Sequence, residues 1–518
     1  MRLIKTYFLL ALIIYLTSCN SSNNVTPYSE VIFLADKETA LTFELYRTDV
    51  KGSAIKRISH DLPLNGDVID FSLSPNGEYV AYRATSGNST LSELFISYIN
   101  GGITYKVSGD FPVQPPVTAG VYQYAWSADS RYLAYLASHQ GDINYKTLFV
   151  TNTIDRSSVN VTPNTEAASF LWSPDSLHIS CTAIKINDVN SLGIYIVDKN
   201  GQNEIKVSGN LQANETVFND GYFWSPDGLY LTYVKRNSSS IEEMYIVMAN
   251  GTNNTNLSNG INAIPEYWTW APNSSRIAYV ADQDTPDTYE LYSVLPDGTD
   301  VVKLSSLQNL NEDVSGFSWA PDSSRIVYRS GEVGSTIQLY TVTPGGMSHT
   351  KISGSLVNDE QVFPESFYWS NNSSRIAYLA NPTTAYSQLF VVNPDGSDLV
   401  SISNTTLIDS NIKADPIWSP DSNNISFQAD TNNTLKLFSV NLSNYNIVQL
   451  SQESSILGGS VIFKNFTWTS DSKHVIYKAT FDDPPYDKLY SVSLDDVHNN
   501  NISGTMVPGG HVDIFDVP

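Results

Sequence analysis

The sequence predicts an all-β protein built from one structural unit that is repeated along the chain. Three observations lead to this prediction. A segment typified by "FSWAPDSSRIVY", which begins at Phe317, recurs about every 50 residues. Eight of the nine tryptophans occupy the same place in it, a distribution that chance does not produce. The segments between the turns are rich in Val, Ile, Tyr and Phe, which favour strands.

Each repeat opens with a short aromatic strand that ends at an anchor residue. The anchors are Leu73, Trp126, Trp172, Trp224, Trp270, Trp319, Trp369, Trp418 and Trp468. Their spacings are 53, 46, 52, 46, 49, 50, 49 and 50 residues, and the ninth tryptophan, Trp268, lies two residues before an anchor. The even spacing predicts one repeating architecture over residues 31–518.

The other elements of a repeat follow in a fixed order. A Ser-Pro-Asp turn comes after the anchor, with proline where its fixed φ is favourable. A second strand, such as residues 276–281, ends near an aromatic residue nine positions after the anchor. A variable polar loop leads to a third strand, such as 290–294, and Asp297-Gly298 supplies the positive φ of a tight hairpin. A fourth strand, such as 301–306, completes an antiparallel unit typical of a propeller blade.

The two ends of the chain complete the count of blades. Residues 31–36 and 44–49 match the second and third strands, so the first unit lacks its first strand. Residues 511–518 resemble the first-strand segment 67–75 and lie one period beyond Trp468. We therefore expect an all-β propeller of about ten blades in one ring, which the C-terminal strand closes. Two smaller fused propellers would show the same periodicity and are the alternative.

The N-terminus predicts export from the cell. Arg2 and Lys5 precede an apolar run over residues 7–16, which is too short to span a membrane. A basic start, an apolar core and small residues before a cleavage point are typical of a secretory signal peptide. We assign residues 1–18 to this signal.

The sequence "LTSC", which ends at Cys19, resembles the bacterial lipobox. The resemblance implies cleavage before Cys19 and diacylation of that cysteine as the only membrane attachment. Asn20, the residue after the cysteine, favours sorting to the outer membrane in the lipoprotein pattern. Residues 19–30 would then form a flexible tether ahead of the repeats. An ordinary signal peptide with an incidental cysteine is the alternative.

Composition excludes several classes of protein. The chain has 29 Lys+Arg against 53 Asp+Glu, a formal net charge of −24. This balance argues against nucleic acid as a partner, because phosphate binding needs a basic surface. It also disfavours direct adsorption to anionic lipid. Two cysteines are too few for a disulfide framework or a zinc-finger array.

We find no motif that carries catalysis. The chain contains no G-x-S-x-G, no H-E-x-x-H and no G-x-x-x-x-G-K-[ST]. The sequence therefore predicts no catalytic residue, no cofactor and no metal site. His178 and His474 lie at the same place beside the turn and are interpreted as polar strand residues. Cys181 replaces the strand tyrosine and is expected to be buried and inert.

Acidic residues have two interpretations. Two loops that follow second strands contain Asp282, Asp284, Asp287, Asp482, Asp483 and Asp487. Clustered carboxylates can coordinate calcium, but neither loop has the EF-hand glycine or terminal glutamate, so a solvated loop is favoured. The repeated aspartates of the turns are expected to cap local backbone N–H groups. These aspartates are Asp175, Asp227, Asp322 and Asp421. The repeated Trp and Tyr are expected to pack between blades.

The complete unit, "WSPDG…IAY…LY…DG…LS", resembles the WD-repeat-like blade of TolB-type propellers, which prolyl-oligopeptidase-type peptidases also carry as a non-catalytic propeller. The resemblance covers the chain after residue 30. It implies a rigid platform that binds other proteins, and sometimes small ligands, through loops around a channel. TolB-type proteins have an α/β domain before the propeller and the peptidases have a C-terminal hydrolase domain, and neither is expected here. The partners of the Tol system are therefore not carried over.

These observations predict a non-catalytic, lipid-anchored protein of the bacterial cell envelope that binds an unidentified envelope protein through its loops. A propeller enzyme acting on polysaccharide, as a lyase or glycoside hydrolase, is one alternative and needs unique polar residues that converge on the channel. A surface adhesin or glycan binder is another, and it would be accessible to protease on intact cells. The sequence does not name the binding surface, because recognition would lie in loops that differ from blade to blade.

Overall fold

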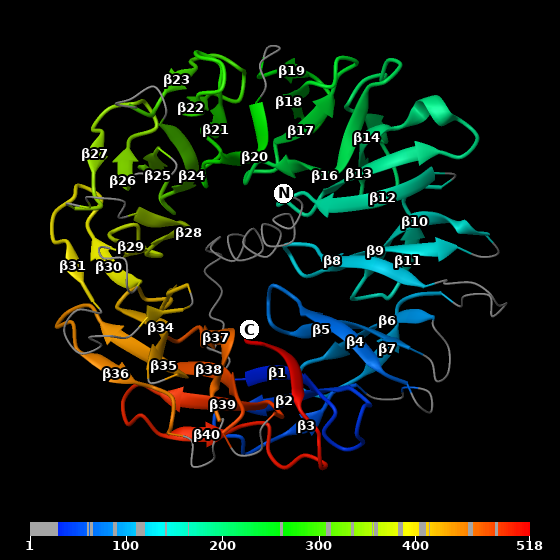
Figure 1. Cartoon of the computed structure of the whole chain (residues 1–518). Coiled ribbons are helices and arrows are strands. Elements are labelled where there is room, and N and C mark those ends of the chain that lie inside the picture. The colour runs from blue at the N-terminus through cyan, green and yellow to red at the C-terminus, as the bar shows by residue number, and fades with distance from the viewer. Residues whose placement is uncertain are drawn as a thin grey trace. The chain divides into compact units, whose positions relative to one another are not determined.

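The computed structural model describes residues 30–518 except 60–61, 63–65, 86–90, 110–119, 140–141, 164, 259–262, 307–311, 333–335, 355, 357–360, 382–386, 403–410, 414, 432, 454–458 and 482–484 (Figure 1). The chain divides into two compact units. One contains residues 57–260, and the other contains residues 29–56 and 261–517. Both are built from antiparallel sheets, most of them four-stranded, so the predicted all-β fold is confirmed.

The first unit contains four sheets, each formed by four consecutive strands. Their strands are β4 (Val68–Leu73), β5 (Tyr79–Thr85), β6 (Ser92–Tyr98) and β7 (Thr104–Lys106); β8 (Val121–Trp126), β9 (Tyr132–His139), β10 (Asp142–Asn152) and β11 (Ser158–Asn160); β12 (Thr165–Trp172), β13 (His178–Lys185), β14 (Gly193–Asp198) and β15 (Ile205–Lys206); and β16 (Thr216–Trp224), β17 (Tyr230–Arg236), β18 (Glu242–Met248) and β19 (Thr255–Asn256). A three-residue 3-10 helix, η2 (Val189–Ser191), lies between β13 and β14.

The second unit contains six blades among its described residues, of which two are joined in one eight-stranded sheet and one has five strands. Their strands are β20 (Ala263–Trp270), β21 (Ile277–Ala281), β22 (Glu290–Val294) and β23 (Val302–Lys303); β24 (Asp313–Trp319), β25 (Ile326–Gly331), β26 (Ile337–Val342) and β27 (Thr350–Lys351); β28 (Gln361–Trp369), β29 (Ile376–Asn381), β30 (Gln388–Val392) and β31 (Val400–Ser401); β32 (Asn411–Ile412) and β33 (Ile417–Trp418), then β34 (Asn424–Thr431), β35 (Thr434–Asn441) and β36 (Ile447–Gln449); β37 (Val461–Trp468), β38 (His474–Ala479), β39 (Lys488–Ser493) and β40 (Asn499–Asn501); and β1 (Glu30–Ala35), β2 (Glu44–Asp49), β3 (Lys56–Arg57) and β41 (Val512–Asp516). A single parallel pair, Ile337 with Gln361, links the β24 and β28 sheets.

The C-terminal strand supplies the missing first strand of the opening blade, as predicted. β41 pairs antiparallel with β1, and Phe515 lies opposite Phe33. Lys478 of the preceding blade reaches the carbonyl of Asp513 at 2.7 Å. The N-terminal and C-terminal parts of the chain therefore share one sheet within the second unit. The single closed ring stays a prediction.

The fourth strands are shorter than expected. The sequence predicts a strand over residues 301–306, but β23 covers Val302–Lys303. The strand ends early because of the serine that follows it. Ser305 Oγ accepts the N–H of Leu291 at 3.0 Å, so a side chain, rather than a backbone carbonyl of the fourth strand, is the partner of this third-strand N–H. Serine or threonine plays the same part in most blades, as Ser353 does for Leu339 at 3.1 Å. Short outer strands also present little open edge for unwanted pairing.

Aromatic pairs fill each blade. In nine of the ten blades the aromatic residue of the second strand stacks on one in the third strand, as Tyr328 does on Tyr340 at 5.3 Å between ring centroids. The exception is the β12 blade, where Cys181 lies opposite Tyr195. Each aromatic side chain buries a large apolar surface, and stacking adds a further favourable contribution.

The anchor tryptophans join neighbouring blades. In both units the indole N–H donates to the backbone carbonyl of the residue just before the preceding anchor. The pairs are Trp126 with Ser72, Trp172 with Ala125, Trp319 with Thr269, Trp369 with Ser318, Trp418 with Tyr368 and Trp468 with Ile417, at 3.0–3.3 Å. The prediction that the repeated tryptophans pack between blades is confirmed.

The connections of a blade fall into two groups. The turns after the anchors and between third and fourth strands lie at one end of each sheet, which we call the constant edge. The loops between second and third strands, and those leading to the next blade, lie at the other end, the variable edge. This division follows from antiparallel pairing, since successive connections alternate between sheet ends. At the constant edge, Gly298 and Gly396 have φ of 80° and 82°, as the Asp-Gly motif predicts.

Candidate functional site

Polar residues of the repeated turns are engaged within the fold. Asp322 accepts the N–H of Ser324 at 2.9 Å, which confirms its expected role as a cap. The N–H of Asp322 in turn donates to Ser373 Oγ of the next blade at 3.0 Å. Equivalent turn-to-turn bonds recur along the second unit, for example from Asp421 to Ser472. A functional site should therefore be sought among residues that differ between blades.

The first strands differ in the length of a bulge near the variable edge. In β28 the chain advances five residues from Val362 to Phe367, while its partner advances two, from Tyr378 to Ala380. The strands β16, β20 and β37 have the same long bulge, over residues 217–222, 263–268 and 461–466. In β24 and most other first strands the bulge has one extra residue. Long bulges expose side chains that a regular strand would pair.

A polar residue from the preceding blade braces three of these long bulges. This polar residue stands in the second strand of its blade, ten positions after the anchor. Its side chain donates a hydrogen bond to a backbone carbonyl in the first strand of the following blade. The braces are Thr182 to Phe218 at 3.4 Å, Arg329 to Val362 at 2.7 Å and Gln428 to Ile462 at 2.8 Å. Gln428 is fully buried and also accepts the N–H of Lys464 at 2.9 Å. The bulges are thus held in fixed positions.

Two long bulges flank an interrupted first strand in the second unit, and together they form the cluster we call the bulge site. It contains Glu365 of β28, Asp415 between β32 and β33, Phe463 and Lys464 of β37, and Tyr368 of β28. Lys464 Nζ lies 2.6 Å from an Asp415 carboxylate oxygen and 5.7 Å from the centroid of the Phe463 ring. Phe463 is 50% exposed, so part of its ring is open to contact with another molecule.

Burial and a neighbouring carboxylate govern the ionisation of Tyr368 at the bulge site. Burial, reinforced by the Asp415 carboxylate, raises the pKa of Tyr368, so its phenol stays protonated at neutral pH. The Tyr368 hydroxyl donates to the carbonyl of Glu365 at 2.9 Å. The Lys464–Asp415 pair is about half exposed and contributes roughly 0–1 kcal/mol to stability. The site therefore offers an exposed aromatic ring, charges of both signs and a fixed backbone.

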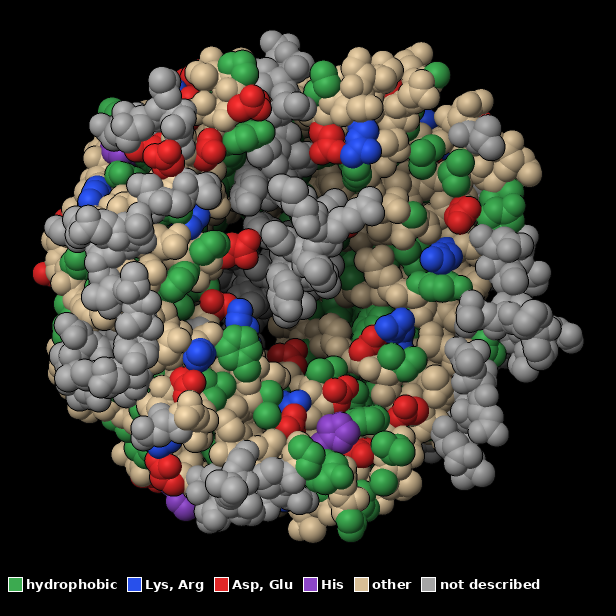
Figure 2. All heavy atoms as spheres, viewed as in Figure 1, with side chains coloured by type: hydrophobic (Ala, Val, Ile, Leu, Met, Phe, Trp, Pro, Cys, Tyr) green, Lys and Arg blue, Asp and Glu red, His purple; other side chains and the backbone are tan. Residues whose placement is uncertain are grey.

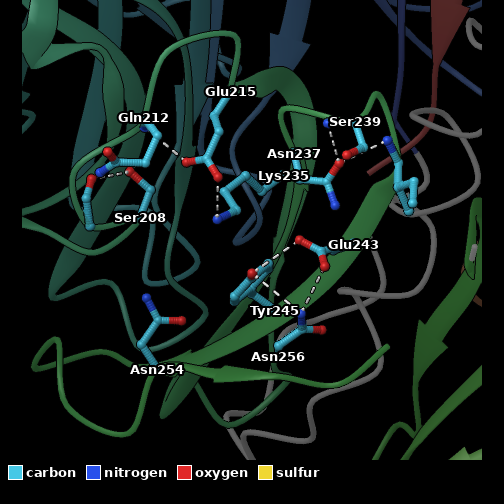
Figure 3. Close-up of polar contacts among 12 residues, drawn as sticks. Ser208, Gln212, Glu215, Lys235, Asn237, Ser239, Glu243, Tyr245, Asn254 and Asn256 are labelled. Atoms are coloured by element: carbon cyan, nitrogen blue, oxygen red, sulfur yellow. Dashed lines mark hydrogen bonds and ion pairs between the residues drawn. The ribbon is translucent and has the colours of Figure 1, made fainter. Parts of the chain in front are cut away.

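A second polar cluster lies at the variable edge of the β16 blade in the first unit (Figure 3). Lys235 Nζ lies 3.4 Å from Glu215 and 4.9 Å from the centroid of the Tyr245 ring. The Tyr245 hydroxyl donates to Glu243 at 3.2 Å, and Asn256 donates to Glu243 at 3.2 Å. In two other blades a lysine of the fourth strand pairs with the glutamate that corresponds to Glu243. In the β16 blade Asn256 takes the place of that lysine, and the cation is Lys235 of the second strand.

The pKa shifts fix the protonation of this cluster. Burial opposes the charge of Lys235, but hydrogen bonding to Tyr245 and the Glu215 carboxylate outweigh it and raise the lysine pKa. Burial also raises the pKa of Tyr245. Both groups stay protonated at neutral pH, so Lys235 acts only as a donor, while the Tyr245 hydroxyl donates to Glu243 and accepts from Asn256. On the face shown in Figure 2, acidic, basic and hydrophobic side chains are interspersed.

The residues singled out in the sequence have the following places. Cys19, Asp482 and Asp483 lie outside the described residues. His178 and His474 begin β13 and β38 as expected. Cys181 is fully buried, and burial raises the pKa of its thiol to about 12.

The acidic loop between β21 and β22 is tied to its own blade. Asp284 lies 3.4 Å from Lys303 Nζ, and Asp282 accepts the N–H of Asp287 at 3.4 Å. Within the described part of the chain, no group of three metal-ligating side chains comes together. None of the helices in that part is long and apolar enough to cross a membrane.

Sequence reasoning missed the bulges and their braces. The sequence does contain a signal for the braces. The residue that directly follows the aromatic position of the second strand is polar in the blades that have a brace and apolar in the other blades. The polar residues at this position are Arg83, Thr182, Arg329, Gln428 and Lys478, and the apolar ones are Leu34, Leu136, Val234, Val280 and Leu379. Arg83 braces β8, and Lys478 braces β41.

The sheets define a protein of the β-propeller type, built from four-stranded blades. No family model matches the chain, and no curated protein matches it. A solved structure of dipeptidyl peptidase 4 from Porphyromonas gingivalis is similar to 75% of this chain, with 13% sequence identity and a TM-score of 0.47. The matched region spans 62% of that protein's length.

Proposed function

We propose that this chain is a non-catalytic, TolB-like propeller scaffold, anchored by lipid in the bacterial cell envelope, that binds another envelope protein. The observation that carries the proposal is the bulge site. There an aromatic side chain, Phe463, is half exposed on a bulge whose backbone is held by the buried Gln428. Exposed aromatic residues on a rigid frame are typical anchors of protein interfaces.

The charge pattern supports a protein partner. The Lys464–Asp415 pair places charges of both signs beside Phe463. Charged groups at the rim of an aromatic anchor steer encounter and select partners more than they add affinity. A formal net charge of −24 over the whole chain favours partners with a basic or mixed surface over other acidic molecules.

The anchor in the proposal is Cys19. Diacylation there, after removal of residues 1–18, would hold the protein at the membrane and place it in the outer membrane according to the lipoprotein pattern. Two acyl chains are enough for stable membrane attachment, whereas one is marginal. No nucleic acid and no cofactor belong to the proposed function.

The proposal is tested by affinity capture from mildly solubilised envelopes. The tagged wild type is compared with Phe463→Ala, Lys464→Ala and Cys19→Ala, and bound proteins are identified by mass spectrometry. We expect one stoichiometric partner that both bulge variants lose. Met347→Ala is the matched control, because Met347 is 71% exposed at the constant edge of the same unit. Equal capture by all variants, or only abundant envelope proteins, would argue against the bulge site.

A further inference from the structure

The chain enters its first blade at the constant edge. β1 is the second strand of that blade, and its first residue, Glu30, lies opposite Asp49 at the end of β2. Asp49 directly precedes the third-to-fourth-strand turn, where its carbonyl accepts the N–H of Gly52 at 3.0 Å. Glu30, the first residue that the structure describes, therefore lies beside a constant-edge turn.

Hydrogen bonds join the constant-edge turns of several neighbouring blades in the second unit. Third-strand hydroxyls donate to the turn of the next blade: Ser293 to Pro344 at 2.7 Å, Thr341 to Pro394 at 2.6 Å. Ser491 does the same to Val50, in the first blade, at 2.5 Å. The turn in which β2 ends is thus joined to the third strand of the preceding blade, β39.

The distance from the anchor to this edge is short. Eleven residue steps separate Cys19 from Glu30. A fully extended chain of that length spans at most about 36–40 Å, and a flexible chain averages roughly 17–20 Å. A strand of about six residues is itself roughly 20 Å long. The variable edge of the first blade is therefore about one strand length farther from Glu30 than the constant edge is.

We infer that the constant edge of the second unit faces the lipid bilayer that carries the anchor, and that the variable edge, with the bulge site, faces away from it. The inference rests on the proposed lipid anchor at Cys19. The turns of this edge carry exposed carboxylates, such as Asp297 and Asp395, which hydrogen bond within their own turns. Repulsion from anionic head groups acts within a Debye length of about 8–10 Å, so the edge faces the bilayer without adsorbing to it.

Energy transfer to labelled lipid tests the orientation. Ser397 is exposed at the constant edge, and Thr285 is exposed in the variable-edge loop between β21 and β22. Full-length lipidated Ser397→Cys and Thr285→Cys are each labelled with a donor dye, while the buried Cys181 stays unlabelled. Each protein is inserted into phosphatidylethanolamine–phosphatidylglycerol vesicles that carry a rhodamine head-group acceptor. We expect at least twofold higher transfer efficiency from position 397 than from position 285.

Each outcome is decisive. Equal transfer, or higher transfer from position 285, overturns the orientation while leaving the anchor intact. Failure of both proteins to bind vesicles, as expected for the Cys19→Ser control, overturns the anchor and the orientation with it. Vesicle binding therefore reports on the proposed anchor, and the ratio of transfer efficiencies reports on the facing edge.

Discussion

Trp172 donates its indole N–H to the backbone carbonyl of Ala125, 3.0 Å away in the preceding blade. Ala125 directly precedes the anchor Trp126, and the same relationship recurs in both units. The ring packs between two sheets while its single donor satisfies a carbonyl beside the preceding anchor. This contact explains why tryptophan, rather than phenylalanine, recurs at the anchor.

The first prediction concerns this bond. Trp172→Phe should lower the free energy of unfolding by about 1 kcal/mol more than Trp224→Phe in the same unit. Both variants make the same change of side chain, but Trp224 Nε1 is buried without a hydrogen-bond partner, whereas Trp172 has one. Urea denaturation monitored by circular dichroism gives both values. Equal losses would show that packing alone maintains the anchor.

The second prediction concerns the brace beneath the bulge site. Gln428→Leu should cost about 1–3 kcal/mol, because the carbonyl of Ile462 and the N–H of Lys464 lose their partners. Hydrogen exchange at the Lys464 amide should accelerate at the same time. Unchanged exchange at Lys464 in a folded Gln428→Leu protein would contradict the bracing role.

The third prediction concerns cysteine reactivity. Burial raises the pKa of Cys181 to about 12, so iodoacetamide at pH 8 should not alkylate it in the native protein. After unfolding, the lipidated protein should take up one label per chain, since Cys19 is acylated. Two labels per unfolded chain would contradict lipidation, and rapid native labelling would contradict burial.

The fourth prediction concerns pH. Partial burial lowers the pKa of His349, which contacts Tyr328 and stacks on Tyr340. A lowered folded-state pKa means that the unfolded chain binds the proton more readily. The contribution to stability is therefore fully present above the ordinary pKa of about 6.5, and it decreases as pH falls through the folded-state value.

His349→Asn tests this dependence without leaving Tyr328 unpartnered. Asn254 and Asn499 occupy the equivalent place in two other blades and hydrogen bond to the matching tyrosines. The variant should show a flatter dependence of unfolding midpoint on pH between about 5 and 7. A midpoint that falls as steeply as in the wild type would assign the pH dependence to other groups.

The repeats could be predicted from the sequence because each strand and turn is specified locally. Proline at the turn, glycine after aspartate and the spaced aromatics each fix one element. The pairing of β41 with β1 followed from the same pattern, because residues 511–518 match a first strand. The bulges were missed, since a bulge depends on pairing register, which strand propensity does not report. The bulge site was missed for a further reason: its residues come from three blades.

Photocrosslinking from position 463 tests the central claim, recognition of a protein at the bulge site, most directly. A benzophenone amino acid replaces Phe463 in growing cells, and the matched control replaces Met347, which is also exposed in the second unit. The account predicts a discrete adduct of higher mass from position 463 on irradiation and none from position 347. Adducts of the same mass from both positions, or none from position 463, would contradict it.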